Sequence, residues 1–150
     1  MTATTTVRRL TAADFDAWLP LWQGYLEFYE TELSDDITRH TFERLVDDKT
    51  NMYGALAINT DGSPVGMVTW LTHPGSWSKS DYVYLEDLFV AATARGTGAG
   101  RALIEHVRDW GDAHGAGKVY WLTAETNKTA QQLYDRVAKK TGFIHYQIEK

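Results

Sequence analysis

Apolar side chains recur every three or four residues over the first third of the chain, which is the spacing of amphipathic helices. Thr11 and Asp14 have the spacing of a capping box, and Ser34 is a second candidate N-cap. The apolar positions after the first cap are Phe15, Trp18, Leu19, Trp22, Leu26, Tyr29 and Leu33. We therefore predict one helix with a buried aromatic face, followed by a second helix from Ser34 to near Asp48.

Shorter apolar runs bounded by turn residues predict strands. These runs are Val7–Leu10, Met52–Ile58, Val65–Thr72, Tyr82–Val90, Val119–Thr123 and Phe143–Ile148. Two further helical patterns, Arg101–His114 and Thr129–Lys139, lie among the later strands. The order β-α-α-β-β-β-α-β-α-β predicts a single α/β (mixed α+β) domain over residues 1–150, with one mixed sheet and helices on both of its faces.

A glycine-rich turn, Arg95-Gly96-Thr97-Gly98-Ala99-Gly100-Arg101, connects the predicted strand Tyr82–Val90 to the next helix. Glycines let the backbone approach a phosphate closely, and a helix start presents unpaired N–H groups to it. A dinucleotide fingerprint would need a third glycine at Arg101, and a Walker A loop would need Gly-Lys-Ser/Thr at residues 100–102. The turn therefore predicts a phosphate-bearing ligand other than NAD or ATP, and a ligand-free connection is the alternative.

Composition narrows the class of protein further. The chain has 150 residues and a net charge of −5, and this balance argues against nucleic acid as a partner. It has no cysteine, so a disulfide, a thiol nucleophile and a zinc–thiolate site are excluded. Its five histidines lack metal-ligand spacing, and we expect no metal. Since no secretory leader or membrane span is recognisable, we expect a cytoplasmic protein without a membrane partner.

Four segments in the second half resemble the GNAT superfamily of N-acetyltransferases. The glycine turn matches the pattern Arg-x-x-Gly-x-Gly of the pyrophosphate loop, and Tyr84–Val90 resembles the strand beside the pantetheine arm of acetyl-CoA. Asn127-x-x-Ala130-x-x-Leu133-Tyr134 resembles the segment that contacts the cofactor, and Gly142-Phe143 the pair after the last helix. The predicted element order agrees with this family. The resemblance implies an acyltransferase that uses acetyl-CoA as cosubstrate.

The spacing after Tyr134 departs from the usual family pattern and indicates which branch of the family the chain resembles. Seven residues, Asp135 to Thr141, separate Tyr134 from Gly142, which adds about one helical turn to the spacing of many members. The Tyr-Leu-Glu-Asp strand and this longer helix look most like the diamine, polyamine and histone acetyltransferase branches.

The resemblance assigns a set of residues to acetyl-CoA. They are Leu88, Phe89, Val90, Arg95, Gly96, Thr97, Gly98, Ala99, Gly100, Arg101, Asn127 and Tyr134. A bulge around Leu88–Val90 would expose backbone N–H groups that polarise the thioester carbonyl. A fully paired strand is the alternative, as is a helix N-cap role for Asn127.

Two side chains are candidates for moving protons. Glu86 is expected to accept the proton of the amine, directly or through a water, and Tyr134 to protonate the leaving thiolate. Asp87 is a further acceptor-side candidate, although alternation would place it on the face of Leu85 and Phe89, opposite Glu86. A plain ion pair for Glu86 and a structural role for Tyr134 are the competing interpretations.

The acceptor is expected to be a small cationic primary amine, such as a polyamine, a diamine or an amino acid. Trp22, Glu27 and Glu30 lie on the segment where related enzymes admit substrate, and carboxylates with aromatic faces suit a cation. A lysine or N-terminus of a protein is the alternative acceptor, and a non-catalytic acetyl-CoA sensor is a third interpretation. Apolar chain ends are compatible with a homodimer. Without cysteine, transfer would be direct.

Overall fold

The computed structural model describes residues 5–150. The first half contains β1 (Thr6–Arg9), the short 3-10 helix η1 (Ala12–Asp14), α1 (Phe15–Phe28), α2 (Asp35–Val46), β2 (Met52–Ile58) and β3 (Pro64–Pro74). The second half contains β4 (Asp81–Val90), the 3-10 helix η2 (Ala92–Ala94), α3 (Ala99–Ala113), β5 (Val119–Tyr120) and α4 (Lys128–Val137).

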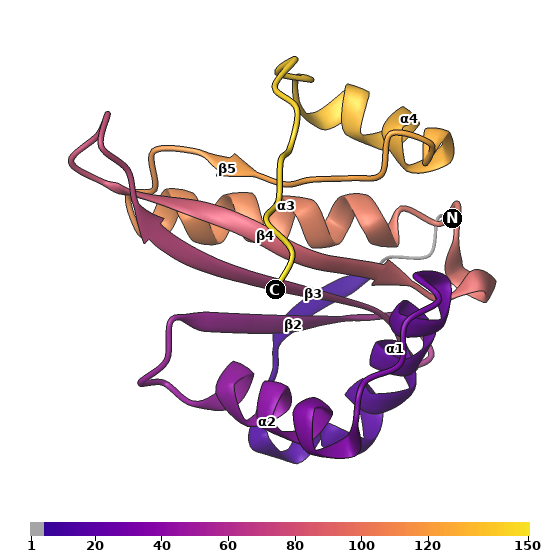
Figure 1. The fold of residues 1–150 in the computed structure, drawn as a ribbon. Coiled ribbons are helices and arrows are strands. Elements are labelled where there is room, and N and C mark those ends of the chain that lie inside the picture. Colours follow the sequence, from indigo (N-terminus) through magenta and orange to yellow (C-terminus); the bar gives the residue numbers. More distant parts are fainter. Residues whose placement is uncertain (1–4) are drawn as a thin grey trace.

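One mixed sheet organises these elements. Its strand order is β1-β2-β3-β4-β5, with antiparallel pairing up to β4 and a parallel β4–β5 pair. The helices α1 and α2 lie on one side of the sheet, and α3 lies on the other (Figure 1). The predicted α/β class, with a mixed sheet covered on both faces, is therefore confirmed.

Each face of the sheet has its own hydrophobic core. On the α3 side, Leu103 and Val107 pack against the buried strand residues Val83 and Leu85. The other core is formed by α1, α2 and the opposite strand faces, with the buried members Leu10, Trp18, Leu21, Trp22, Phe42, Leu45, Leu56 and Met67. The periodicities thus bury most of the faces that the apolar pattern predicts. The first helix is shorter than predicted: α1 ends at Phe28, and Tyr29 and Leu33, which the pattern placed on its buried face, are exposed.

The strand predicted over 143–148 is not formed. The chain after α4 is extended, but it has no strand neighbour among the described residues, and Phe143 is 90% exposed. The prediction was wrong because a strand needs a hydrogen-bonding partner, and the apolar pattern by itself does not supply one. Within residues 5–150, no helix combines the length and apolar character needed to cross a bilayer.

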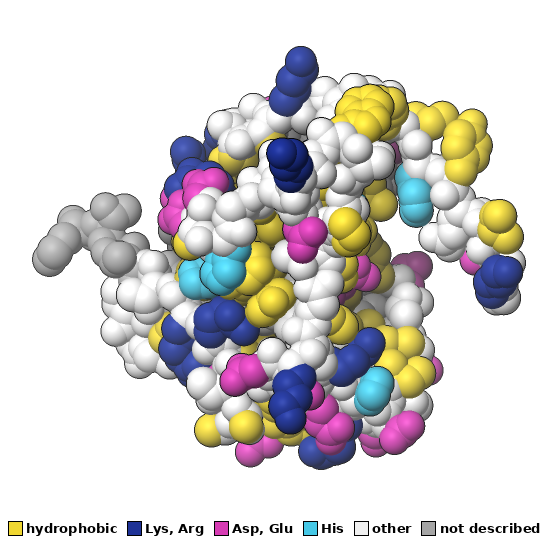
Figure 2. Space-filling view, turned by 90° about the vertical axis from the view of Figure 1, so that its left-hand side faces the viewer, with side chains coloured by type: hydrophobic (Ala, Val, Ile, Leu, Met, Phe, Trp, Pro, Cys, Tyr) yellow, Lys and Arg dark blue, Asp and Glu magenta, His cyan; other side chains and the backbone are white. Residues whose placement is uncertain are grey.

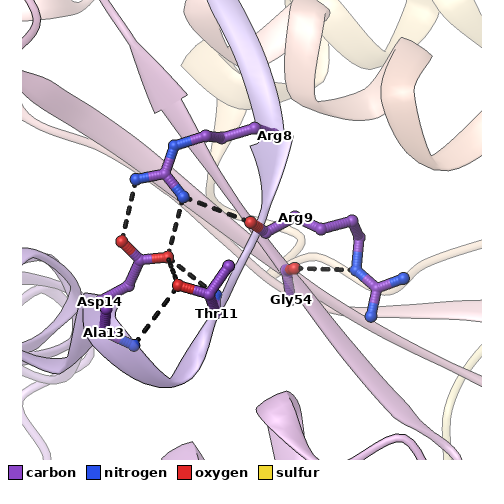
Figure 3. Close-up of polar contacts among 6 residues, drawn as sticks. All are labelled: Arg8, Arg9, Thr11, Ala13, Asp14 and Gly54. Carbon is purple, nitrogen blue, oxygen red and sulfur yellow. Dashed lines mark hydrogen bonds and ion pairs between the residues drawn. The ribbon is translucent and has the colours of Figure 1, made fainter.

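A polar corner connects β1 to α1 (Figure 3). Both carboxylate oxygens of Asp14 accept hydrogen bonds from Arg8, at 2.8 and 2.9 Å, and the backbone N–H of Thr11 donates to the same carboxylate at 2.8 Å. The Thr11 hydroxyl accepts from the N–H of Ala13 and completes the predicted capping box. The Arg8 contact, opposed by burial, lowers the pKa of Asp14 from 3.8 to about 2.

We expect Asp14→Asn to reduce the free energy of unfolding by about 1–2 kcal/mol at pH 7, because a partly exposed bidentate ion pair is lost. Since the folded pKa lies below the unfolded one, this contribution is present above about pH 4 and is lost as the pH falls toward 2. Urea unfolding at pH 7 and pH 3, with the exposed Asp48→Asn as control, measures it. An equal loss at both pH values would contradict the assignment.

Candidate acetyl-transfer site

The candidate site begins where β4 and β5 separate. Only Val83 and Tyr84 of β4 pair with β5, at Val119 and Tyr120. From Leu85 to Val90, β4 keeps its neighbour β3 on one side and, within residues 5–150, has no strand on the other. A stretch of backbone donors and acceptors is therefore without a strand partner, just before the glycine turn that leads into α3.

The strand geometry identifies the free groups. The N–H of Ala91 donates to Val65 on the β3 side at 2.8 Å, and successive residues alternate their N–H direction along a strand. The N–H groups of Leu88 and Val90 therefore point to the open side, while that of Phe89 points toward β3. Consistently, the carbonyl of Val90 accepts a hydrogen bond from Arg95 Nε at 3.1 Å.

A β-bulge lies at Glu86, upstream of the expected position. Thr69 pairs with Asp87 and Trp70 pairs with Leu85, so Glu86 is the extra residue on β4. The bulge interrupts the alternation that would have placed Leu85 and Asp87 on one face. Leu85 faces the α3 core, whereas Asp87 faces α1, as Phe89 does. The free donors at Leu88 and Val90 result from the departure of β5 and not from a bulge at those residues.

The two acidic residues of β4 have different environments. Asp87 is buried, with 9% of its surface exposed, and burial raises its pKa to about 6. The neighbouring hydroxyls of Tyr25 and Thr69 oppose this shift, and the negative charge of Glu86 adds to it. Glu86 is more exposed, and partial burial raises the pKa of its carboxyl as well. Both carboxyls are therefore more basic than ordinary ones.

A row of tyrosines connects α1 to α4 past these carboxyls. Tyr25 faces Asp87, and its ring lies 5.0 Å from that of Tyr29. Tyr29 lies close enough to Tyr134 to contribute to the raised pKa of its hydroxyl. The ring of Tyr134 packs against that of Trp121, with 5.4 Å between the ring centroids. Burial raises the pKa of Tyr134 above its usual range, so its hydroxyl carries a proton at neutral pH. The i, i+4 spacing of Tyr25 and Tyr29 is the sequence feature that could have placed both rings beside these carboxyls. The same spacing is equally typical of aromatic residues in a hydrophobic core.

The glycine turn forms an uncapped helix start at the other end of the free β4 edge. Gly96 and Gly98 have φ values of 81° and 90°, and a Cβ at either position would meet nothing within 4 Å. Gly98 is the N-cap of α3, and no side chain caps it. The first N–H groups of α3 therefore have neither an intrahelical partner nor a side-chain cap, as an anion-binding helix start requires.

Neighbouring side chains hold this turn in place. Thr97 hydrogen-bonds to the carbonyl of Ala94, and Ala99 is buried under the turn. A Cβ at Gly100 would lie 3.3 Å from Leu133, so this glycine lets α3 approach α4. The two predicted phosphate-binding arginines are exposed. Arg95 binds the Val90 carbonyl, and Arg101 forms an ion pair with Glu105 at 2.7 Å.

Asn127 occupies the N-cap position of α4, where its side chain accepts a hydrogen bond from the N–H of Ala130 at 3.4 Å. The helix N-cap role that was the alternative for Asn127 is thereby confirmed. The cap uses the side-chain oxygen, so the amide N–H₂ is left for another partner. The cap orients the helix that carries Tyr134.

The three acceptor-side residues on the first helix are separated by the fold. Glu27 and Glu30 line a surface hollow at the end of α1. Trp22 is 5% exposed, lies in the core and donates its indole N–H to Thr38 at 3.1 Å. The expectation that Trp22 contacts an acceptor is therefore corrected, because its face and its donor are already used in packing α1 against α2.

Comparison with known proteins identifies the family. The family model described as "Acetyltransferase (GNAT) family" matches residues 15–138. The chain is 38% identical over 141 residues to D-amino-acid N-acetyltransferase HPA3 of Saccharomyces cerevisiae, covering 93% of this chain and 88% of that protein. The chain belongs to the GNAT family, and it is an acyltransferase of the N-acetyltransferase class.

Solved structures show the same fold at lower identity. The ribosomal-protein-alanine N-acetyltransferase of Brucella melitensis biovar Abortus 2308 superposes with a TM-score of 0.83 at 20% identity, covering 98% of this chain and 100% of that one. Aminoglycoside N-acetyltransferase AAC(6')-Iy, solved in complex with CoA, gives 0.84 at 18% identity, with coverage of 100% and 97%. The family uses acetyl-CoA.

We expect Asp87→Asn to gain stability relative to the unsubstituted protein as the pH rises from 4 to 7. The folded pKa of about 6 lies above the ordinary 3.8, so the folded state binds the extra proton and loses stability as the pH passes through this window. The difference between the two proteins should grow by about 2–3 kcal/mol. Chemical denaturation at pH 4, 5, 6 and 7 measures it.

Asp81→Asn, at the exposed start of the same strand, is the matched control and should show no such trend. A constant difference between Asp87→Asn and the unsubstituted protein across the window would mean that Asp87 titrates normally in the fold.

Proposed function

We propose that this enzyme transfers acetyl from acetyl-CoA directly to the primary amine of a small cationic acceptor. The observation that supports this most is the free β4 edge, which has the carboxyl of Glu86 at one end, the uncapped start of α3 at the other and Tyr134 on the adjoining helix. Glu86, the free backbone N–H groups and Tyr134 would then supply base, donors and acid to one bound thioester.

The residues around the opening suit acetyl-CoA, which supplies an acetyl group activated as a thioester. The backbone N–H groups of the glycine turn and of the first turn of α3 would hold the pyrophosphate, with Arg95 and Arg101 alongside. The free edge at Leu88–Val90 would bind the pantetheine arm, and the amide of Asn127 is available from α4. The exposed, unobstructed glycines at 96 and 98 carry this assignment.

The chain's own groups provide each proton and charge that acetyl transfer needs. Glu86 accepts a proton from the acceptor's ammonium, directly or through a water, so that the free amine nitrogen bonds to the acetyl carbon. The N–H of Leu88 stabilises negative charge on the acetyl oxygen, and the N–H of Val90, one repeat further along the same edge, is left for the pantetheine arm. As the carbon–sulfur bond breaks, the hydroxyl of Tyr134 gives its proton to the thiolate, and the second proton that the nitrogen still carries after attack passes to the tyrosinate, directly or through a water. No cysteine is present to form an acetyl-enzyme.

The acceptor class follows from charge. Glu86 lies on the free stretch of β4, and Glu27 and Glu30 line the surface hollow at the end of α1, where carboxylates attract ammonium groups. A relative at 38% identity is named for acetylating D-amino acids, so amino acids of both hands belong in this class together with diamines and polyamines.

Thiol release from acetyl-CoA by the purified protein tests this function. We expect stimulation by one class in a panel of polyamines, diamines, L- and D-amino acids, aminoglycosides and lysine peptides. Stimulation by the peptides alone would instead identify a protein acceptor. Acetyl-CoA binding without release by any amine would identify a sensor.

We expect Tyr134→Phe to lower kcat by about 100-fold and to leave KM for the amine nearly unchanged, because proton donation to the thiolate is lost while packing against Trp121 is kept. Steady-state kinetics on the preferred amine measure this. Tyr82→Phe, at the far end of β4, is the control and should retain full activity. Equal kcat values for both variants would remove Tyr134 from the chemistry.

We expect Glu86→Gln to lower kcat/KM by about 10- to 100-fold and to abolish the lower inflection of its pH profile. Burial raises the pKa of Glu86, so this inflection should lie above the usual range of a glutamate, separate from the later one that belongs to the amine. Rates between pH 5 and 9 measure it, with the exposed Glu43→Gln as control. An unchanged lower inflection in the variant would exclude Glu86 as the base.

A further inference from the structure

The point where β4 and β5 separate is held by very little backbone. Beside the two paired residues of β5, the N–H of Val83 donates to the Lys118 carbonyl and that of Gly117 to the Asp81 carbonyl, each at 2.9 Å. Figure 1 shows the chain running on from β5 toward α4 without further pairing. So short a ladder restrains the point of separation weakly, and something else must fix it.

A side-chain hydrogen bond joins β3 to β5 at this point, across the face of β4. The Tyr120 hydroxyl on β5 lies 2.7 Å from Nε2 of His73 on β3. Tyr82 is the β4 residue paired with His73, and the rings of Tyr82 and Tyr120 both meet the imidazole edge-on with centroids 5.7 Å away. Because β4 lies between β3 and β5 in the sheet, this bond connects two strands that share no ladder.

The direction of this hydrogen bond is fixed by a second one. Nδ1 of His73 lies 2.9 Å from the carbonyl oxygen of Pro74, which can only accept. The proton of the neutral ring is therefore on Nδ1, and Nε2 accepts from the Tyr120 hydroxyl. The imidazole is thus held on one side by the backbone of β3 and holds β5 on the other.

Ring contacts surround the hydrogen bond on the sheet face opposite α3. The rings of Tyr84 and Tyr120 lie 5.0 Å apart, and Lys118 Nζ lies 4.4 Å from the centroid of the Tyr82 ring. Figure 2 looks onto this end of the molecule and shows histidine, basic and hydrophobic side chains together on its surface. These contacts use the rings, so they remain when a tyrosine loses only its hydroxyl.

The residue after Tyr120 is fixed on the other face of the sheet. Trp121 packs against the core on the α3 side and against the ring of Tyr134, with 5.4 Å between the centroids. The chain is therefore held from both faces where it leaves β4, by Tyr120 on one and by Trp121 on the other. Both side chains oppose a shift of the point of separation along β4.

We propose that His73 and Tyr120 are positioning residues for acetyl transfer, and that their hydrogen bond sets where β5 leaves β4 and so keeps the edge at Leu88–Val90 open for the cofactor. Without this bond the point of separation shifts, and the open edge is present in fewer molecules. If it is present in a tenth of them, the apparent Kd for the cofactor rises about tenfold. The role of the open edge rests on the proposed function, whereas the hydrogen bond itself does not.

Calorimetric titration with CoA tests the proposal without an acceptor amine. We expect Tyr120→Phe and His73→Leu each to raise the Kd for CoA by about tenfold. His73→Gln should recover most of the affinity, because its side-chain oxygen can accept from the hydroxyl. Tyr82→Phe, which loses a hydroxyl beside the same imidazole, is the matched control and should bind CoA normally. In steady-state kinetics, KM for the amine should stay nearly unchanged in all four variants.

Thermal melting of the same variants separates positioning from simple stabilisation. A lower melting temperature with an unchanged Kd for CoA would mean that the hydrogen bond only stabilises the fold, and it would overturn the proposal. CoA binding that all variants retain overturns the positioning role and leaves the proposed function standing. An unsubstituted protein that fails to bind CoA contradicts both.

Amide hydrogen exchange observes the point of separation directly. We expect Tyr120→Phe to speed exchange of the Val83 amide by about tenfold, since local opening there becomes easier. The Leu10 amide, bonded to Gly54 at 2.9 Å on the β1 side of the sheet, is the internal reference and should not change. Combining His73→Leu with Tyr120→Phe should add nothing further, because both remove one interaction. Additive effects, or an unchanged Val83 amide, would disprove the positioning role.

Discussion

The ladder between β4 and β5 stops after Val83 and Tyr84, and the free edge that follows determines what the rest of the site can do. Backbone N–H groups without a partner inside a fold are costly unless something else accepts from them. At Leu88 and Val90 these donors have no strand partner within residues 5–150. The fold keeps them in place from the other side, where the antiparallel ladder with β3 continues to Gly66 and Val90. Rigid support on one edge and freedom on the other make the strand a preorganised binding surface.

The bulge at Glu86 divides the acidic pair according to function. By inserting one residue opposite Thr69 and Trp70, it turns Asp87 toward α1 and leaves Glu86 more exposed. Packing on the α1 side is tight, since a Cβ at Gly24 would lie 2.7 Å from the ring of Phe89. Asp87 thus serves as a buried partner for Tyr25, and Glu86 remains the more accessible carboxyl of the two.

Local pattern determined most of the elements, the capping box at Thr11 and Asp14, and the glycine turn, because these depend on residues a few positions apart. The family could be recognised for the same reason, since its motifs are short and contiguous. Only the tertiary structure decided the position of the bulge at Glu86, which depends on the register with β3, and the pKa of Asp87, which depends on burial under α1. It also removed Trp22 from the site and left residues 143–148 without a strand partner, because burial and strand pairing are properties of neighbours that lie far away in the chain.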